Sequence, residues 1–308
     1  MGDSWQNLLE ERIAQCLHGE AAAVALARTL RPSRHKYDMG HLLLIAGSAG
    51  MTGAMVLAAR GAARSGCGLV TVAHPAGGDT QLNVAVPTVM TRVMDWRAPL
   101  ESVGPLSRYT ALAVGPGTGR APLRAEGVRR LLSCEDLPPL ALDADALWAV
   151  SPEGNGGRPF DFGSVRGALA LTPHLGEFRR LFPDSSADES QVDAAAQRFG
   201  NSHDRLLVLK QAVTRIYTGG RCVVHSAPNG GLASGGSGDV LLGVFGGFMA
   251  WMPSMELAAL SAVLAHSVAG AAARAELGEL AMNPSDVADR LDVGVRRVET
   301  LIRESLAV

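Results

Sequence analysis

The chain has 308 residues, of which 47% are hydrophobic, 19% charged and 5% aromatic, and its formal net charge is −2. The near-neutral charge argues against a nucleic-acid surface or a polybasic membrane anchor, and the scarcity of aromatic residues argues against a stacking platform for single strands. This length is enough for one large domain or two small ones with real cores. The four cysteines lie far apart without a C-x-x-C pair, which predicts reduced thiols in a cytoplasmic protein.

The first predicted element is helical and runs from residue 5 to about residue 30, as one or two helices that end before Pro32. This region carries acidic residues, no basic start and no long apolar run, so it does not resemble a secretory signal. No repeat, low-complexity tract or linker follows it. We therefore expect an N-terminal helical segment over residues 1–30 and a single domain over residues 31–308.

Short apolar runs recur along this domain, and each is followed by glycine or polar residues. The runs predicted to be strands are residues 41–46, 69–73, 111–114, 140–142, 168–171 and 206–209, with a hairpin formed by residues 214–217 and 222–224. Helices are expected over residues 52–59 and from residue 240 onward. Continuous apolar strands separated by helices predict a mostly parallel central sheet covered by helices on both faces. Such sheets bind ligands at the carboxyl ends of their strands.

The most apolar late segment, Leu257–Ala273, is short for a membrane span and contains His266. We expect it to be a buried core helix, and we expect no membrane contact.

Two glycine-rich loops follow predicted strands. The loop Gly47–Ala54 lacks the Gly-Lys-Ser/Thr of a P-loop and the spacing of a dinucleotide fingerprint. It is either a tight turn or a loop whose following helix offers N–H groups to a phosphate or ribose. The loop Gly115–Gly119 has no β-carbon at three positions, so it is either a simple turn or a place where the backbone approaches a ligand closely.

Two carboxylates, Asp143 and Asp145, follow a predicted strand. They could reach a hydrated Mg²⁺ ion, or they could cap the next helix. We favour capping for at least one of them. No His and Cys cluster has metal-ligand spacing, so no protein metal site is predicted.

The segment from Thr172 to Glu177 is predicted to begin a helix, with Thr172 as the N-cap and Pro173 at the first helical position. His174 would then point from the helix start into the ligand cleft, and we favour a site role over a structural one. Lys210 follows the next strand and is either a contact to a nucleotide phosphate or a solvated lysine.

The most informative segment is Gly235-Gly236-Ser237-Gly238-Asp239, which precedes an apolar helix. Backbone N–H groups at such a helix start can bind an anion. A carboxylate at the same place suits a base that takes a proton from a hydroxyl as that hydroxyl attacks a phosphoryl group. The alternative is a glycine-rich turn followed by an exposed aspartate.

In this order, the motifs resemble the ADP- or ATP-dependent NAD(P)H-hydrate dehydratases of the ribokinase-like superfamily. The resemblance covers about residues 30–290. The segments that carry it are His35–Gly40, Gly47–Ala54, Gly66–Thr71, Val114–Gly119, Leu142–Leu147, Leu171–Glu177, Leu209–Thr214 and Asn229–Leu241, with a weaker match at Pro284–Val287. It implies a three-layer α/β ribokinase-like fold with a mostly parallel central sheet.

The resemblance also implies a function. Its family dehydrates the S epimer of hydrated NADH or NADPH (NADHX or NADPHX) back to NADH or NADPH, with ADP, or in some members ATP, as co-substrate. Phosphorylation makes the C6 hydroxyl a good leaving group, and AMP and phosphate are the products. Mg²⁺, held largely by phosphate oxygens and water, a homo-oligomer such as a homotetramer, and a separate NAD(P)H-hydrate epimerase as functional partner are implied as well.

Site residues follow from motif position within this resemblance. The expected contacts to the hydrated cofactor are Ala54, Gly117, His174 and Asp239, and Asp239 is the expected catalytic base. The expected nucleotide contacts are Lys210, Gln211, Ala212, Val213, Thr214 and Gly238. The expected anion hole consists of the amides of Gly235, Gly236, Ser237 and Gly238.

Two other functions share parts of this pattern. An alcohol kinase of the same superfamily would have the loop that ends at Asp239 but would not need the loops at Gly117 and His174. A nucleotide-binding protein without turnover would not need Asp239 at all.

Overall fold

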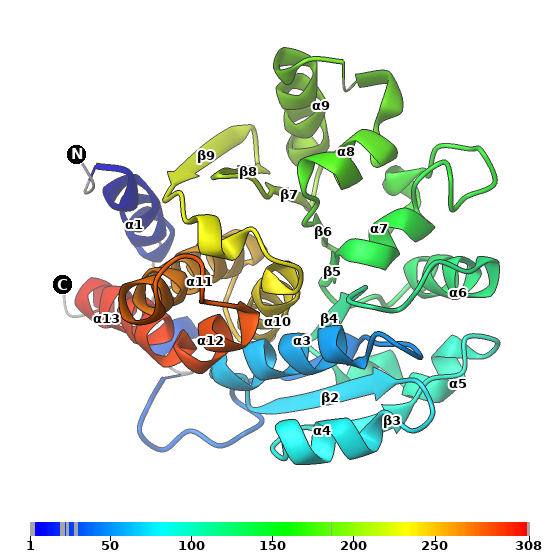
Figure 1. The fold of residues 1–308 in the computed structure, drawn as a ribbon, viewed down its shortest axis with the longest axis horizontal. Helices are drawn as coiled ribbons and strands as arrows, with labels where there is room; N and C mark the ends of the chain where they lie inside the picture. The colour runs from blue at the N-terminus through cyan, green and yellow to red at the C-terminus, as the bar shows by residue number, and fades with distance from the viewer. Residues whose placement is uncertain (1–3, 19–21, 23–24, 28–29, 186, 307–308) are drawn as a thin grey trace.

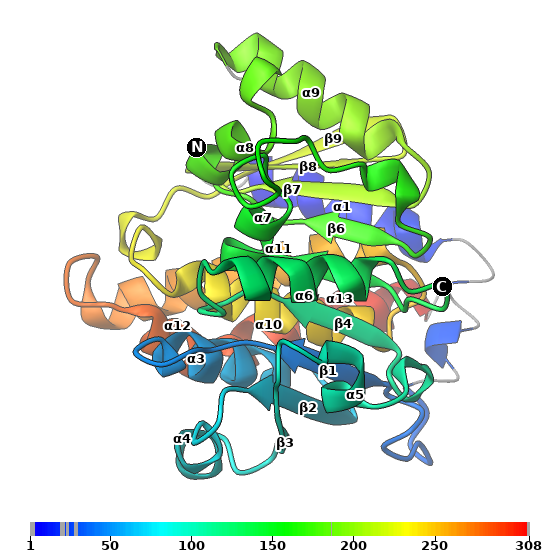
Figure 2. The same cartoon turned by 90° about the vertical axis from the view of Figure 1, so that its right-hand side faces the viewer.

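The computed structural model describes residues 4–18, 22, 25–27, 30–185 and 187–306. Its centre is a nine-stranded sheet with the strand order β3-β2-β1-β4-β5-β6-β7-β8-β9 (Figures 1 and 2). The pairings from β3 across to β7 are parallel, and those of β7 with β8 and of β8 with β9 are antiparallel. The strands are β1 (His41–Ile45), β2 (Leu69–His74), β3 (Met90–Val93), β4 (Ala111–Val114), β5 (Leu140–Leu142), β6 (Leu169–Leu171), β7 (Arg205–Leu209), β8 (Val213–Thr218) and β9 (Arg221–Ser226).

Both faces of the sheet are covered by helices, which confirms the predicted fold class (Figure 1). Along β1, Leu42 and Leu44 enter one core cluster while Leu43 and Ile45 enter the other. The first cluster includes side chains of α1 (Ser4–Leu17), α3 (Thr52–Arg64), α10 (Ser237–Met249), α11 (Met255–Leu277), α12 (Pro284–Asp289) and α13 (Leu291–Leu306). The second includes side chains of α5 (Pro99–Val103), α6 (Pro122–Leu132), α7 (Ala144–Ala149), α8 (Leu175–Leu181) and α9 (Glu189–Asn201).

The predicted strands match the observed ones to within a residue or two, but the sequence reading missed β3. This strand lies at the edge of the sheet beside α4 (Asp79–Ala85), and Met90 and Val93 are exposed. An edge strand with one neighbour and an exposed face needs no continuous apolar run, so the pattern that identified the other strands is absent.

The helix α1 is part of the main core. Its residues Leu9, Ile13 and Leu17 are buried in the same cluster as α11 and α13. Ion pairs join it to both helices, with Arg12 Nε 2.8 Å from a Glu256 oxygen and Arg297 Nη2 2.6 Å from Glu10 Oε2. Part of the predicted N-terminal helical segment lies outside the described residues, and the boundary at residue 30 stays a prediction.

The helix α11 has the length and hydropathy of a membrane span. Most of its residues, from Leu257 to Ala273, are nevertheless packed inside the protein against α10 and α13. This burial confirms the prediction of a core helix.

Glycines allow α3 and α10 to lie in direct contact. A Cβ added at Gly243 would overlap the carbonyl group of Ala58, and one added at Gly61 would overlap the carbonyl oxygen of Val240. The two helix backbones therefore touch where side chains would normally separate them. This contact fixes the position of the N-terminus of α10.

We expect Gly243→Ala to lower the free energy of unfolding by about 1–3 kcal/mol, because the added methyl group must displace backbone atoms. Chemical denaturation measures the loss. Gly53→Ala in α3 is the matched control, since a Cβ there meets no atom within 4 Å. Equal stability of the Gly243→Ala variant and the wild type would contradict the close contact.

Candidate active site

The loops that follow five parallel strands gather at one edge of the sheet. The chain passes from β1 to β2 in one direction across the sheet and from β4 to β5 in the opposite direction, so the switch point, where open α/β sheets bind ligands, lies at the carboxyl ends of β1 and β4. The Gly47 amide donates to the Pro116 carbonyl at 2.8 Å, which joins the loops after these two strands. The Lys210 amide donates to the Pro173 carbonyl at 2.8 Å and joins the loops after β6 and β7 in the same way.

The N-terminus of α10 presents free backbone amides at this edge. Gly236 is its N-cap, with a left-handed φ of 107° and no capping side chain. The amides of Gly235, Gly236, Gly238 and Asp239 donate to no acceptor within the described part of the chain. The Ser237 amide was expected to be part of the anion hole as well. It donates instead to the Ser234 carbonyl at 3.3 Å, so it is not free to bind an anion. The remaining amides, with the helix dipole behind them, form a site that attracts an anion.

Behind this loop lies His266 of α11, which the sequence reading used only as an argument against a membrane span. Its Nε2 lies 3.0 Å from the Ser237 carbonyl oxygen and 3.2 Å from Ser237 Oγ. Burial lowers the pKa of His266 to about 4, so the ring is neutral at physiological pH. A neutral ring that donates from Nε2 to the Ser237 carbonyl holds the first turn of α10 in place. The signal available in the sequence was a single histidine in the predominantly apolar segment Leu257–Ala273.

The side chain of Asp239 stands in the first turn of α10 and is half-buried. Its carboxylate has neither a hydrogen-bond partner nor an ion-pair partner among the residues that the structure describes. Burial, and then the negative charge of Asp143, raise the pKa of Asp239 to about 7, and the Lys210 ammonium opposes this shift. A carboxylate that titrates near neutral pH in an anion-binding loop is suited to act as a general base.

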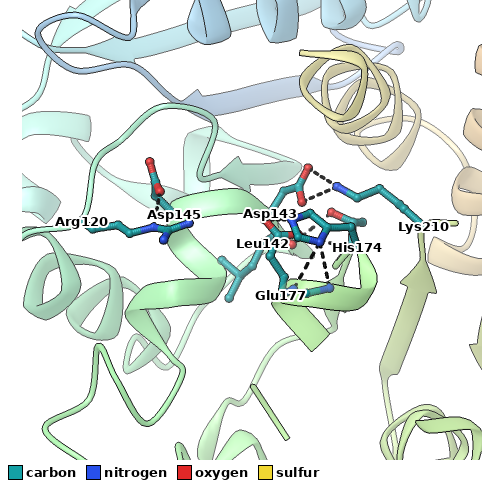
Figure 3. Close-up of polar contacts among 9 residues, drawn as sticks. Arg120, Leu142, Asp143, Asp145, His174, Glu177 and Lys210 are labelled. Atoms are coloured by element: carbon teal, nitrogen blue, oxygen red, sulfur yellow. Dashed lines mark hydrogen bonds and ion pairs between the residues drawn. The ribbon is translucent and has the colours of Figure 1, made fainter. Parts of the chain in front are cut away.

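Lys210 forms an ion pair with Asp143 across the site (Figure 3). Its Nζ lies 2.6 Å and 2.9 Å from the two carboxylate oxygens, and the side chains of Lys210 and Asp143 are 19% and 2% exposed. A Cβ at Gly238 would lie 3.0 Å from the ammonium group. The interpretation of Lys210 as a solvated lysine is therefore wrong, because its charge is fixed beside the anion-binding loop.

The second carboxylate, Asp145, supports the loop after β4. It accepts a hydrogen bond from the Gly119 amide at 2.8 Å and pairs with Arg120 Nε at 3.0 Å (Figure 3). The helix α7 begins after Asp143 without a side-chain capping bond. The expectation that one of the two carboxylates caps this helix is therefore wrong. Each carboxylate instead forms an ion pair with a residue distant in sequence, Asp143 with Lys210 and Asp145 with Arg120.

The helix α8 begins two residues later than predicted. Its N-cap is His174, whose Nδ1 accepts hydrogen bonds from the amides of Gly176 at 3.0 Å and Glu177 at 3.3 Å. The assignment of Thr172 as N-cap is wrong, because a parallel bridge between His174 and Lys210 continues the strand pairing past the end of β6. Since Nδ1 accepts these bonds, the ring carries its proton on Nε2, which lies 3.5 Å from Glu177 Oε1 in a half-exposed side chain.

The predicted contact residues fall into groups that are close in space. A Cβ at Gly117, whose φ is +62°, would lie 3.1 Å from the Cβ of Ala54, so the loop after β4 packs directly against the first turn of α3. Residues 210–214 form the turn between β7 and β8, where Gln211 and Ala212 are exposed, Val213 and Thr214 begin β8, and Lys210 lies beside Gly238. The structure thus brings the expected nucleotide residues together, while their contacts to a nucleotide stay predictions.

The comparison with protein families identifies the family to which this chain belongs. The family model described as NAD(P)H-hydrate dehydratase matches residues 42–292. The chain belongs to this family. The matched range holds the loops after β1, β4, β5, β6 and β7 together with α10.

The chain is also similar in sequence to individual members of the dehydratase family. The chain is 33% identical over 290 residues to a bifunctional NAD(P)H-hydrate repair enzyme of Moorella thermoacetica, covering 89% of this chain and 53% of the relative. It is 31% identical to an ADP-dependent (S)-NAD(P)H-hydrate dehydratase of Lactiplantibacillus plantarum, covering 79% of this chain and 84% of the relative. The chain spans about half the length of the bifunctional relatives that it matches.

A solved structure shares the ribokinase-like fold. It is an ADP/ATP-dependent NAD(P)H-hydrate dehydratase of Bacillus subtilis co-crystallised with ATP and Mg²⁺. The TM-score is 0.75 at 27% sequence identity, and the match covers 87% of this chain and 93% of the other. The dehydratase fold therefore extends over nearly all of the two chains.

Proposed function

We propose that this chain catalyses the ADP-dependent dehydration of the S epimer of hydrated NADH and NADPH, giving NADH or NADPH, AMP and phosphate. One observation carries the proposal: the unpartnered carboxylate of Asp239 lies in the same helical turn as free backbone amides. The dehydratase family model and the ADP-dependent relative from Lactiplantibacillus plantarum support this choice of substrate and co-substrate.

The proposed reaction begins with proton transfer. The Asp239 carboxylate takes the proton of the C6 hydroxyl, and the hydroxyl oxygen attacks the β-phosphorus of ADP. The bond from this phosphorus to the bridging oxygen breaks, and AMP leaves with the electron pair. The loop amides and the Lys210 ammonium stabilise the charge on the transferring group.

Elimination completes the proposed reaction. The C6–oxygen bond breaks, phosphate leaves with its electron pair, and the proton lost from C5 passes to water as its bonding electrons form the C5–C6 double bond. Phosphate is a far better leaving group than hydroxide, which is the reason for using ADP.

We propose that Mg²⁺ enters this site together with the nucleotide. In the described ranges, no group of three or more His, Cys, Asp or Glu side chains is placed to hold a metal ion, and the Asp143 carboxylate is already bonded to Lys210. A divalent ion fits if phosphate oxygens and water supply most of its ligands, with the negative charges of Asp239 and Asp145 nearby. When bound, the ion would neutralise charge on the phosphate oxygens.

A coupled assay tests the proposed function. Purified protein is offered hydrated NADH with ADP or with ATP, while absorbance of the reduced nicotinamide, AMP and inorganic phosphate are measured. We expect absorbance to return with one AMP and one phosphate for each NADH formed from ADP. An alcohol kinase would give a phosphorylated alcohol without this absorbance, and a binding protein would release no phosphate.

We also propose the wider setting implied by the family. The chain would repair one epimer and work with a separate NAD(P)H-hydrate epimerase. It would act in the cytoplasm, which the four unpaired cysteines support. We further propose a homo-oligomer, with a homotetramer as the expected state, to be measured by sedimentation.

His174→Ala tests the role of the histidine. We expect the variant to raise KM for the hydrated cofactor by about 10-fold or more while KM for ADP changes less, because the half-exposed ring, whose Nε2 lies 3.5 Å from Glu177 Oε1, is no longer available to the substrate. Steady-state kinetics with each substrate varied in turn give both constants. His174→Asn is the control, since asparagine can still accept the capping bonds. Equal changes in both KM values would identify a structural histidine.

A further inference from the structure

An arginine near the β1–β4 switch point, Arg124, has no ion-pair partner among the residues that the structure describes. Arg124 lies in the first turn of α6, which contains no acidic residue in that turn. Within the described chain it forms no hydrogen bond or ion pair through its side chain, whereas neighbouring Arg120 pairs with Asp145. A cation at the positive end of a helix dipole is unfavourable. Something other than this chain is therefore expected to supply the compensating negative charge.

The guanidinium of Arg124 is placed over the loop after β4. A Cβ at Gly119 would overlap its Nη1 atom, and φ of +82° at Gly119 is a second reason why glycine stands there. The guanidinium thus occupies the space that a side chain would fill. Arg124 is half-buried, so this position is held against the loop and does not extend freely into solvent.

A second polar group without a partner, the hydroxyl of Ser48, lies beside the same glycine, Gly119. Ser48, in the loop after β1, is 2% exposed, and its hydroxyl has no hydrogen-bond partner. The same added Cβ at Gly119 would lie 3.3 Å from Ser48 Oγ. A buried hydroxyl without a partner costs free energy unless a ligand completes its bonding.

The N-terminus of α3 adds a third feature. Met51 is its N-cap without a capping side chain, and the amides of Thr52, Gly53 and Ala54 donate to no acceptor in the ranges described. Met51 also lies against Gly117 in the loop after β4. A guanidinium, a hydroxyl and free helix amides all favour an oxyanion with several acceptor atoms, which is the chemistry of a phosphate group.

We propose that Arg124, Ser48 and the N-terminus of α3 bind a phosphate group of the hydrated dinucleotide. This site is separate from the loop that would hold the phosphoryl group in transfer, at α10. The proposal rests on the proposed function for the identity of the ligand. The phosphate has two sources, the pyrophosphate bridge and the 2′-phosphate of the NADPH form, and the experiment separates them.

The experiment compares KM values for hydrated NADH, hydrated NADPH and hydrated reduced nicotinamide riboside, which carries no phosphate. For Arg124→Gln we expect KM to rise about 10- to 100-fold for one or both dinucleotides relative to the riboside, the usual effect of losing a charge-assisted hydrogen bond. A rise for both identifies the pyrophosphate bridge, and a rise for hydrated NADPH alone identifies the 2′-phosphate. Unchanged KM values, or an equal rise for the riboside, would overturn the proposal.

Two further variants guard against effects on folding. Ser48→Ala removes a buried hydroxyl that has no partner, so we expect an unchanged or higher Tm together with a higher KM for the dinucleotides. A structural serine would lower Tm and leave KM unchanged. Arg158→Gln is the matched control, because Arg158 is an exposed arginine whose side chain makes no ion pair within the described residues.

A direct binding measurement tests the anion site without depending on the proposed enzymatic activity. Inorganic pyrophosphate is titrated calorimetrically into the wild type and into Arg124→Gln, with ADP at saturation to occupy both the nucleotide site and the anion-binding loop of α10. We expect affinity at least about 10-fold weaker in the variant. Equal affinities would refute the anion site even for an active enzyme, and a difference would support it even if hydrated NADH proved not to be a substrate.

Discussion

We expect Asp239→Asn to lose at least about 100-fold in kcat while it still binds ADP, because the amide cannot accept the hydroxyl proton. The amides of Gly235, Gly236 and Gly238 stay in place in this variant, so the anion-binding loop is preserved. Single-turnover kinetics with hydrated NADH measure the chemical step, and calorimetry measures ADP affinity.

The control for this variant is Asp136→Asn, which neutralises an exposed aspartate in the loop between α6 and β5. We expect it to behave as the wild type. A rate for Asp239→Asn within a few-fold of the wild type would remove Asp239 from the mechanism.

The raised pKa of Asp239 gives this prediction a pH dependence. Because the base must be ionised and its pKa is raised to about 7, kcat/KM of the wild type should fall about tenfold for each pH unit below that value. A flat profile between pH 5 and about 7 in the wild type would show that a different group accepts the proton.

The free energy of unfolding should depend on pH in the opposite direction from kcat/KM: the contribution of Asp239 should increase as the pH falls. The folded protein binds the Asp239 proton more tightly than the unfolded chain does, since the pKa is raised from 3.8 to about 7. The contribution of Asp239 to stability is therefore fully present below about pH 4 and is lost as the pH rises through about 7. We expect Asp239→Asn to have a higher Tm than the wild type at pH 8, and this difference should shrink as the pH falls from about 7 to about 4.

The second large effect is expected at the buried ion pair. Lys210→Met leaves the Asp143 carboxylate, which is 2% exposed, without its cation. We expect the free energy of unfolding at neutral pH to fall by about 3–5 kcal/mol, the usual cost of leaving a buried charge unpaired. Urea denaturation measures the change, and Lys36→Met at an exposed lysine is the control.

The double variant Asp143→Asn with Lys210→Met separates the pair from its two members. Removing both charges should restore most of the lost stability, because no uncompensated charge stays buried. The Lys210 ammonium lowers the pKa of Asp239 while Asp143 raises it. The acid limb of kcat/KM should therefore move to higher pH in the single variant and return toward the wild-type position in the double variant. Additive stability losses would contradict the ion pair.

The sequence predicted most of the fold because the central strands are continuous apolar runs followed by glycine or polar residues. It could not predict the edge strand β3, whose Met90 and Val93 are exposed, or the delayed start of α8. The delay depends on the bridge between His174 and Lys210, which forms only when the two loops are side by side. Local patterns contain no information about such pairings.

The sequence predicted only part of the candidate site, because local motifs do not show which distant residues pair with one another. Motif order named Asp239 and the loops that the structure gathers at one edge of the sheet. The partners were missed, because Lys210 and Asp143 are 67 residues apart and Ser237 and His266 are 29 apart. Which of several possible partners a charged side chain takes is decided by the tertiary fold.

One isotope measurement tests the proposed chemistry most directly. Hydrated NADH is prepared with a heavy oxygen isotope in its C6 hydroxyl and converted with ADP, and the phosphate and water produced are examined by mass spectrometry. If that hydroxyl attacks the phosphoryl group, the heavy oxygen leaves in inorganic phosphate. Recovery of the heavy oxygen in water would show that hydroxide leaves directly, and it would contradict the role assigned to Asp239 and the amides of α10.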